Sequence, residues 1–215
     1  MNTGPFVDTL LKVLTPAEAA FVAGVSIRDV HRVIDEQILP HSLYSTQQAR
    51  SLRSEACAFI SFYFQAADRL TAEERQRTIR TASRHCLDWT AGEKCSVQDD
   101  FLTIDLSPFW KSAQERLCRL REAQEMVSAE EEVLGGTPVI KGTRVPVYDV
   151  AASVSAGLPK ERILAAYPSL NGNQVELAAL FAEANPQRGR PRHRPSPPAG
   201  AVIVSSRRKL RRSYT

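Results

Sequence analysis

The sequence predicts a mainly α-helical protein with short β-arms. A helical middle region is expected to join two helix-turn-helix-like units, and a disordered basic tail to end the chain. Helix-start signals followed by apolar residues at helical spacing recur along the chain, which favours helices. A run rich in glycine, proline and β-branched residues, 134–147, favours short extended arms instead. We therefore expect a first unit over residues 1–45 and a middle region with a β-hairpin over 46–130. A second unit should follow over 131–186, and the tail over 187–215.

The first unit carries two adjacent helix starts. Thr15 can cap a helix, Pro16 suits its first position and Glu18 completes a capping box. The run Gly24–Ser26 then breaks the chain, and Ser26 can cap a second helix that extends to about Glu36. Apolar residues fall on one face of this second helix: Val25, Val30, Val33 and Ile34. Two short helices with a glycine turn are typical of a helix-turn-helix unit.

The middle region is expected to be mostly helical. An amphipathic helix is predicted from about 46 to 70, and a capping box at Thr71 starts another that reaches about residue 87. Alternating residues over 101–106 predict a strand that can pair with 95–98. A further helix over 108–127 is anchored by Trp110, Leu117 and Leu120.

The second unit begins with the run Leu134–Val147, which contains three glycines, two prolines and two cations. Its glycines favour backbone bends and its prolines prevent one continuous helix. The run lacks the Lys-Ser/Thr that closes a phosphate-binding loop. Three short helices should follow over about 147–156, 159–166 and 171–184, the last capped by Asn171 with Gln174.

The run resembles the bacterial domain of unknown function 433 family over about residues 130–191. It does so together with Tyr148–Val150, Gly157, the Ala165–Pro168 stretch and the Ala184–Pro186 exit. That resemblance implies a small helical, DNA-binding-like domain and a VapB-type antitoxin role beside a toxin of the PIN ribonuclease type. The first unit resembles the N-terminal half of MerR-like and excisionase-like DNA-binding domains, which turn toward a wing where this chain has Gln37–Pro40.

Charge is distributed unevenly along the chain. The net charge is +4, but residues 187–215 hold nine cations and no acid. The remaining 186 residues therefore carry nineteen cations against twenty-four acids, a balance of −5. An acidic body does not favour non-specific nucleic-acid binding, whereas the tail can meet DNA phosphate or an acidic protein surface.

Candidate DNA contacts lie on the polar face of the second helix. In a helix-turn-helix this face enters the major groove, and arginines there can reach guanine edges. The alternative is a solvated face of a helical hairpin that only packs or dimerises. Lys141 and Arg144 could contact phosphates or could simply be solvated. The nearly apolar helix over 171–184 favours a core or dimer contact over base reading. The predicted DNA-binding residues are Ser26, Arg28, His31, Arg32, Lys141 and Arg144.

The tail offers candidate toxin contacts. Arg188–Pro191 is similar to the core of an AT-hook, which would lie in an A·T minor groove. The VapB-type resemblance implies instead that an arginine of the tail enters the acidic metal site of the toxin, with an apolar island as its anchor. A merely solubilising tail is the remaining alternative. The predicted toxin-binding residues are Arg190, Arg192, Val202, Ile203, Val204, Arg207, Arg208 and Arg211.

Other functional classes find little support. The four cysteines, Cys57, Cys86, Cys95 and Cys118, form no CxxC pair and are expected to be free thiols in a reducing cytoplasm. Only His85 lies near a cysteine, so neither a metal nor another cofactor is expected. No histidine, serine or carboxylate stands in a catalytic motif, so we do not expect an enzyme. No stretch is apolar for long enough to cross a membrane, and residues 1–13 lack secretory-signal features.

The leading hypothesis is a cytoplasmic, homodimeric antitoxin that binds a PIN-type ribonuclease toxin and the DNA of its own operator. The alternative is a dimeric transcription regulator without a toxin, in which the first unit reads DNA and the second dimerises. A third possibility is an interaction adaptor with no role at nucleic acid.

Overall fold

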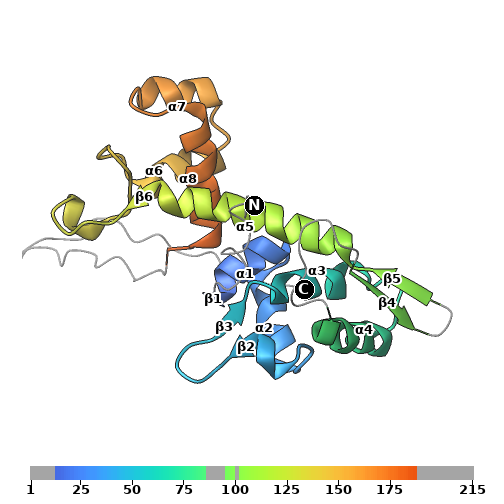
Figure 1. Ribbon diagram of the computed structural model, residues 1–215. Helices are drawn as coiled ribbons and strands as arrows, with labels where there is room; N and C mark the ends of the chain where they lie inside the picture. Colours follow the sequence, from blue (N-terminus) through green and yellow to red (C-terminus); the bar gives the residue numbers. More distant parts are fainter. Residues whose placement is uncertain (1–12, 86–94, 100–101, 188–215) are drawn as a thin grey trace, which may run out of the picture.

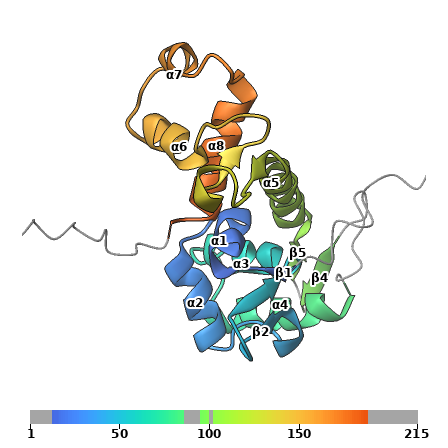
Figure 2. The same cartoon turned by 90° about the vertical axis from the view of Figure 1, so that its left-hand side faces the viewer.

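The computed structural model describes residues 13–85, 95–99 and 102–187. Eight α-helices with short strands make up most of these residues, which confirms the predicted mainly α fold (Figure 1). Both views place helices α6 to α8 at one end of the molecule and α2, β2 and α4 at the other (Figures 1 and 2). The long helix α5 and the short helix α1 lie between the two ends.

The N-terminal end combines two helices with a three-stranded antiparallel sheet. The strand order is β1-β3-β2, so Leu52 of the central strand pairs with Leu14 on one side and Tyr44 on the other. Leu14 and Leu52 are fully buried, which fixes the register of these very short strands. The elements are β1 (Val13–Leu14), α1 (Pro16–Ala23), α2 (Ile27–Asp35), the 3-10 turn η2 (His41–Leu43), β2 (Tyr44–Ser45) and β3 (Ser51–Arg53).

The predicted helix over 46–70 is wrong in its first part. Residues 51–53 form strand β3, and the helix α3 spans only Ala56–Gln65. Leu52 is buried and its two neighbours are half-exposed, and this alternation of burial from one residue to the next is typical of a strand. The continuous apolar run that makes a buried helix begins only at Ala56.

Helix α1 starts as its sequence predicts and is tied to α5. The Glu18 carboxylate accepts hydrogen bonds from the Thr15 N–H at 2.9 Å and from the Thr15 hydroxyl at 3.0 Å, completing the predicted capping box. Its other oxygen accepts a 2.6 Å bond from the Gln124 side chain. These bonds satisfy a carboxylate that is only 7% exposed, as a buried charge requires.

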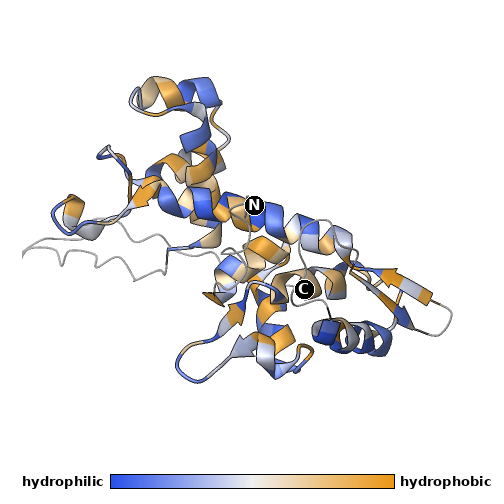
Figure 3. Cartoon of the chain, in the orientation of Figure 1, coloured by the Kyte–Doolittle hydropathy of each residue, from blue (hydrophilic) through white to orange (hydrophobic). Residues whose placement is uncertain are grey.

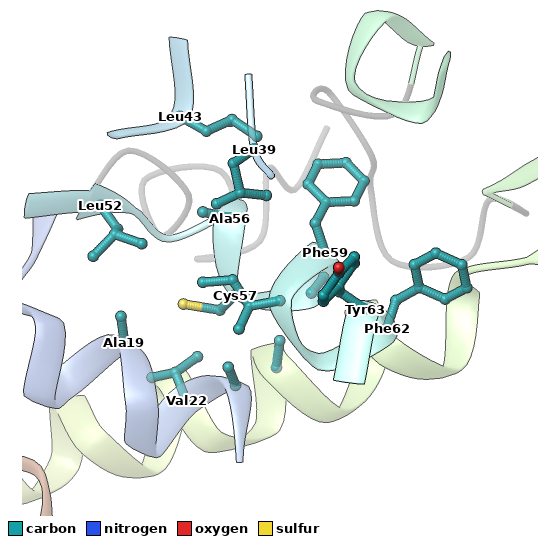
Figure 4. Packing of buried hydrophobic residues seen from close by; sticks show 14 of the residues in the cluster. Ala19, Val22, Leu39, Leu43, Leu52, Ala56, Cys57, Phe59, Phe62 and Tyr63 are labelled. Carbon is teal, nitrogen blue, oxygen red and sulfur yellow. The ribbon is translucent and has the colours of Figure 1, made fainter. Parts of the chain in front are cut away.

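The larger core is built around α3. Leu39, Leu43 and Leu52 approach this helix from one side, and Ala19 and Val22 of α1 from another (Figure 4). Phe59 meets Trp110 of α5 edge to face, with ring centroids 5.5 Å apart, so the predicted Trp110 anchor is confirmed. The remaining elements here are α4 (Ala72–His85), the antiparallel hairpin β4 (Ser96–Asp99) with β5 (Leu102–Asp105), and α5 (Ser107–Glu125).

The C-terminal end has a smaller core of its own. Strands β6 and β7 pair antiparallel, and the three short helices that follow confirm the prediction for this region. Helix α8 packs on α6, α7, α5 and α1, so its apolar surface is largely covered by the same chain. Ile140, Val150 and Val175 are buried in this core. The elements are β6 (Val127–Ser128), the 3-10 turn η3 (Leu134–Gly136), β7 (Val139–Ile140), α6 (Val147–Ser155), α7 (Lys160–Ala166) and α8 (Gly172–Ala184).

One cysteine differs from the prediction. Cys95 is disulfide-bonded, so the expectation of four free thiols is wrong for this residue. Sequence spacing could not show this, because pairing depends on the approach of two Cα atoms in the folded chain. Cys57 and Cys118 are free, as predicted.

Candidate nucleic-acid interface

Helix α2 exposes a polar face at one end of the molecule. Its apolar residues, Val30, Val33 and Ile34, are buried against the core, which turns the opposite side outward. Arg28 stands on the exposed side and has no hydrogen-bond or ion-pair partner among the described residues. Its guanidinium is therefore free to form bidentate bonds, the geometry with which arginine binds a guanine edge or a phosphate.

Ser26 has a structural role at the start of this helix. Its hydroxyl donates a 2.7 Å bond to the Asp29 carboxylate and accepts a 3.1 Å bond from the Asp29 N–H. The Asp29 side chain also accepts from the Ser26 N–H, so the two residues form a capping box. The hydroxyl predicted to contact DNA thus already caps α2.

Arg32 is paired within the helix. Its Nε donates a 2.9 Å bond to the carboxylate of Glu36, one turn further along, and both side chains are about half exposed. This hydrogen bond and the negative charge of Glu36 raise the pKa of the Arg32 guanidinium. Because both partners are exposed to solvent, this pair is weak and a stronger anion can displace Glu36.

A second arginine joins α2 from the loop between β2 and β3. We call this loop, residues 46–50, the wing loop; all five of its residues are exposed. Its last residue, Arg50, bonds the Asp35 carboxylate through both terminal nitrogens, at 2.8 and 3.3 Å. The same guanidinium lies 3.1 Å from Nδ1 of His31. His31, another predicted DNA contact, is therefore one of the residues through which α2 contacts the wing loop.

Sequence patterns did not identify Arg50, because it lies 19 residues from His31. The polar run Ser45–Arg50, between the apolar Tyr44 and Leu52, is the signal that could have indicated a hairpin there. Its position beside α2 depends on the pairing of β3 with β1 and β2. Only the fold supplies that information.

Lys141 and Arg144 lie at the opposite end of the molecule from α2. They occupy the exposed turn between β7 and α6, which the Thr143 hydroxyl closes by donating a 2.7 Å bond to the carbonyl of Ile140. The Lys141 N–H donates to the carbonyl of Met126 at 2.8 Å. The structure therefore does not bring these two cations together with Arg28 and Arg32 (Figures 1 and 2). All of the predicted toxin-binding residues, from Arg190 to Arg211, lie outside the described residues.

The described ranges contain neither a metal-binding cluster nor a membrane-spanning helix. No group of three or more His, Cys, Asp and Glu side chains there could hold a metal ion. None of the helices in those ranges has the length and apolar character needed to cross a membrane.

Comparison with known proteins confirms one resemblance. Residues 127–182 match the family described as Protein of unknown function (DUF433), in the region where the sequence indicated it. The chain is 51% identical over 211 residues to the uncharacterized protein y4eO of Sinorhizobium fredii (strain NBRC 101917 / NGR234), a match that covers 95% of this chain and 96% of that protein. The crystal structure of Rv2018 from Mycobacterium tuberculosis aligns at 18% identity with a TM-score of 0.30, over 77% of this chain and 96% of that one. That similarity is too low to support an inference.

Proposed function

We propose that this chain, which belongs to the family of the rhizobial protein y4eO, is an antitoxin of a type II toxin–antitoxin system. In this proposal it neutralises a PIN-type ribonuclease toxin and represses its own operon by binding DNA as a homodimer in the cytoplasm. The observation that carries the DNA-binding half is the pair of arginines on one surface, Arg28 of α2 and Arg50 of the wing loop. The toxin-binding half is supported by the resemblance of the domain at 127–182 and by the basic tail.

The arrangement of α1, α2 and the sheet supports a DNA-reading role. Two short helices joined by Gly24–Ser26 support a helix-turn-helix, the motif whose second helix lies in the major groove. Here the hairpin β2–β3 adds a loop beside that helix, and Arg50 bridges the loop to Asp35 and His31. In such a pose Arg28 reads bases while Arg50 contacts the backbone.

The test of DNA binding compares single arginine variants on the DNA upstream of the protein's own reading frame. Arg28→Ala should weaken binding roughly 5- to 150-fold, because one good bidentate base contact gives about 1–3 kcal/mol of discrimination. Arg32→Ala should weaken it less, since Glu36 already holds that side chain. Arg162→Ala is the matched control: it removes an exposed arginine from α7 at the other end of the molecule. If Arg28→Ala binds like this control in a gel shift, α2 does not read the operator.

The test of toxin binding is rescue from growth arrest on co-expression with the product of a neighbouring small reading frame rich in spaced Asp and Glu. Removal of residues 187–215 should abolish rescue, because it removes the basic tail, with nine cations, whose arginine is proposed to enter an acidic metal site. Arg28→Ala should rescue fully while it fails to repress the promoter. Full rescue by the shortened chain would refute the role of the tail, and the lack of such a neighbouring gene would remove most support for the antitoxin.

A toxin-independent dimeric transcription regulator is the second candidate. The exposed arginines of α2 and the wing loop support this candidate equally well, because DNA binding through these side chains needs no toxin. Promoter repression without any protein partner, in a strain where no neighbouring gene arrests growth, would favour this candidate.

A further inference from the structure

We propose that the proposed DNA interface extends onto α4, through a phosphate-binding cleft at the C-terminal end of α2. The proposal rests on the DNA-binding half of the proposed function. The cleft has a volume of about 410 Å³ and lies between the segment that follows α2 and the last turns of α4. Its side chains include Gln37, His41, Ser42, Arg80 and Arg84, and the lining residues that the structure describes include no carboxylate. A cleft with cations and no acids favours an anion.

The donors in the cleft are available to a ligand. Arg84 is exposed and has no partner among the described residues. Arg80 has only a long 3.4 Å bond to the Gln76 side chain. Nδ1 of His41 forms a 2.9 Å hydrogen bond with the Tyr44 hydroxyl, so Nε2 is the ring nitrogen that can bind a ligand. Both arginines can therefore turn toward a phosphate without breaking a strong interaction.

The fold explains why α4 reaches this position. Gln37 adopts a left-handed conformation with φ 53°, which ends α2 and redirects the chain so that Ile38 and Leu39 become buried. On α4, Thr78, Ile79, Ala82 and Ser83 are buried, while Arg80 and Arg84 are exposed. The exposed length of α4 is mostly hydrophilic (Figure 3). The cations of α4 thus lie beside the end of α2 because both helices pack on the same core.

The spacing suits a DNA backbone. An α-helix with its side chains is about 10–12 Å in diameter, so α2 can enter the major groove, which is roughly 12 Å wide. A duplex that receives α2 in this groove brings a row of phosphates past the C-terminal end of the helix. The wing loop, α2 and α4 lie along one edge of the molecule in both views (Figures 1 and 2). The cleft therefore accepts a backbone phosphate beside the bases that α2 reads.

The experiment measures the salt dependence of binding by the full-length protein. Two duplexes of equal length are compared: the DNA upstream of its own reading frame and a random sequence. Arg80→Ala and Arg84→Ala should each lower affinity on the order of tenfold for both duplexes, because a phosphate contact carries no sequence information. Each should also reduce the slope of log affinity against log salt by about 0.9. Arg28→Ala should lose affinity mainly for the first duplex, and Arg162→Ala should behave like the natural protein.

Failure of the cleft and failure of the proposed DNA function give different results. Arg84→Lys keeps the charge, so it should keep the slope; loss of the slope in this variant would show that the slope does not depend on this charge and would contradict the proposal. An unchanged slope in the double variant Arg80→Ala/Arg84→Ala, while Arg28→Ala still weakens binding, overturns the cleft and leaves the DNA function intact. Binding of inorganic phosphate that Arg84→Ala abolishes, with an unchanged DNA slope, assigns the cleft to a free phosphate and overturns the backbone contact. A natural protein that binds neither duplex overturns both proposals.

Discussion

Substitution of Gly24 by alanine tests the turn that orients α2. Gly24 ends α1 in the left-handed conformation, with φ 68° and ψ 39°, and its N–H reaches the carbonyls of Ala20 and Phe21. An L-residue in this conformation costs roughly 1–2 kcal/mol. A Cβ at this position would also lie 1.6 Å from a terminal nitrogen of Arg116, which is far inside van der Waals contact.

The backbone strain should outweigh the contact with Arg116. The clashing atoms belong to the far end of a long side chain, which has no partner among the described residues and can rotate away. An off-rotamer side chain costs about 0.5–1.5 kcal/mol at most, and Arg116 has other staggered rotamers to adopt. We therefore expect Gly24→Ala to lose about 1–2 kcal/mol of unfolding free energy. For a chain of this size each kcal/mol lowers the Tm by about 2–4 °C.

Gly157 supplies a matched control for this measurement. It has φ 73°, and no atom lies within 4 Å of the position that a Cβ would occupy. Urea unfolding of Gly24→Ala, Gly157→Ala, Arg116→Ala and the double variant Gly24→Ala/Arg116→Ala separates strain from contact. Both glycine variants should lose similar stability, and the coupling with Arg116 should stay below about 0.5 kcal/mol. A much larger loss at Gly24 that Arg116→Ala restores would refute the reasoning, as would a Gly24→Ala protein of unchanged stability.

Three further predictions concern single groups. Ser26→Ala should cost about 1 kcal/mol in thermal unfolding through loss of the α2 cap, whereas Ser26→Asn, a good cap, should cost much less; equal losses would contradict the capping role. The hydrogen bond and charge of Lys160, with a smaller contribution from Arg119, lower the pKa of Glu176. The stability from this carboxylate is thus present above pH 4.5 and lost as the pH falls through its lowered pKa, and Glu176→Gln should flatten this part of a Tm–pH curve. Burial raises the pKa of the Cys57 thiol, so a thiol reagent should label the half-buried Cys118 in the native protein and Cys57 only after unfolding.

The sequence predicted the features of this fold that depend on local chemistry. The capping boxes at Thr15, Thr71 and Asn171 each involve a side chain and a backbone group three residues apart, so their signals survive without tertiary context. Strand β3 was missed because three residues carry too little periodicity, and its identity depends on pairing with β1 and β2.

The candidate site was predictable only in part, for the same reason. Arg28 lies on the exposed face of a helix whose start and apolar side are evident in the sequence. Arg50 and Arg84 reach the same edge of the molecule from elements 22 and 56 positions further along the chain. The sheet and the shared core place them there, and no local pattern contains that information. The role of Ser26 was predicted twice, as a cap and as a DNA contact, and its two bonds to Asp29 favour the cap.

Helix α1 links the surface that we assign to DNA with the domain at 127–182. It packs on α2, α3, α5 and α8, and four of its eight residues, Ala19, Ala20, Val22 and Ala23, are buried apolar residues. Glu18 fixes its start to α5, while Gly24 fixes the direction in which α2 leaves it. A cleft of about 590 Å³ beside this turn is lined by Phe21, Arg116 and Glu183, so α1, α5 and α8 meet there. Because α2 takes its orientation from a helix that also packs on α8, a force that displaces α8 must either move α2 or break the buried contacts of α1.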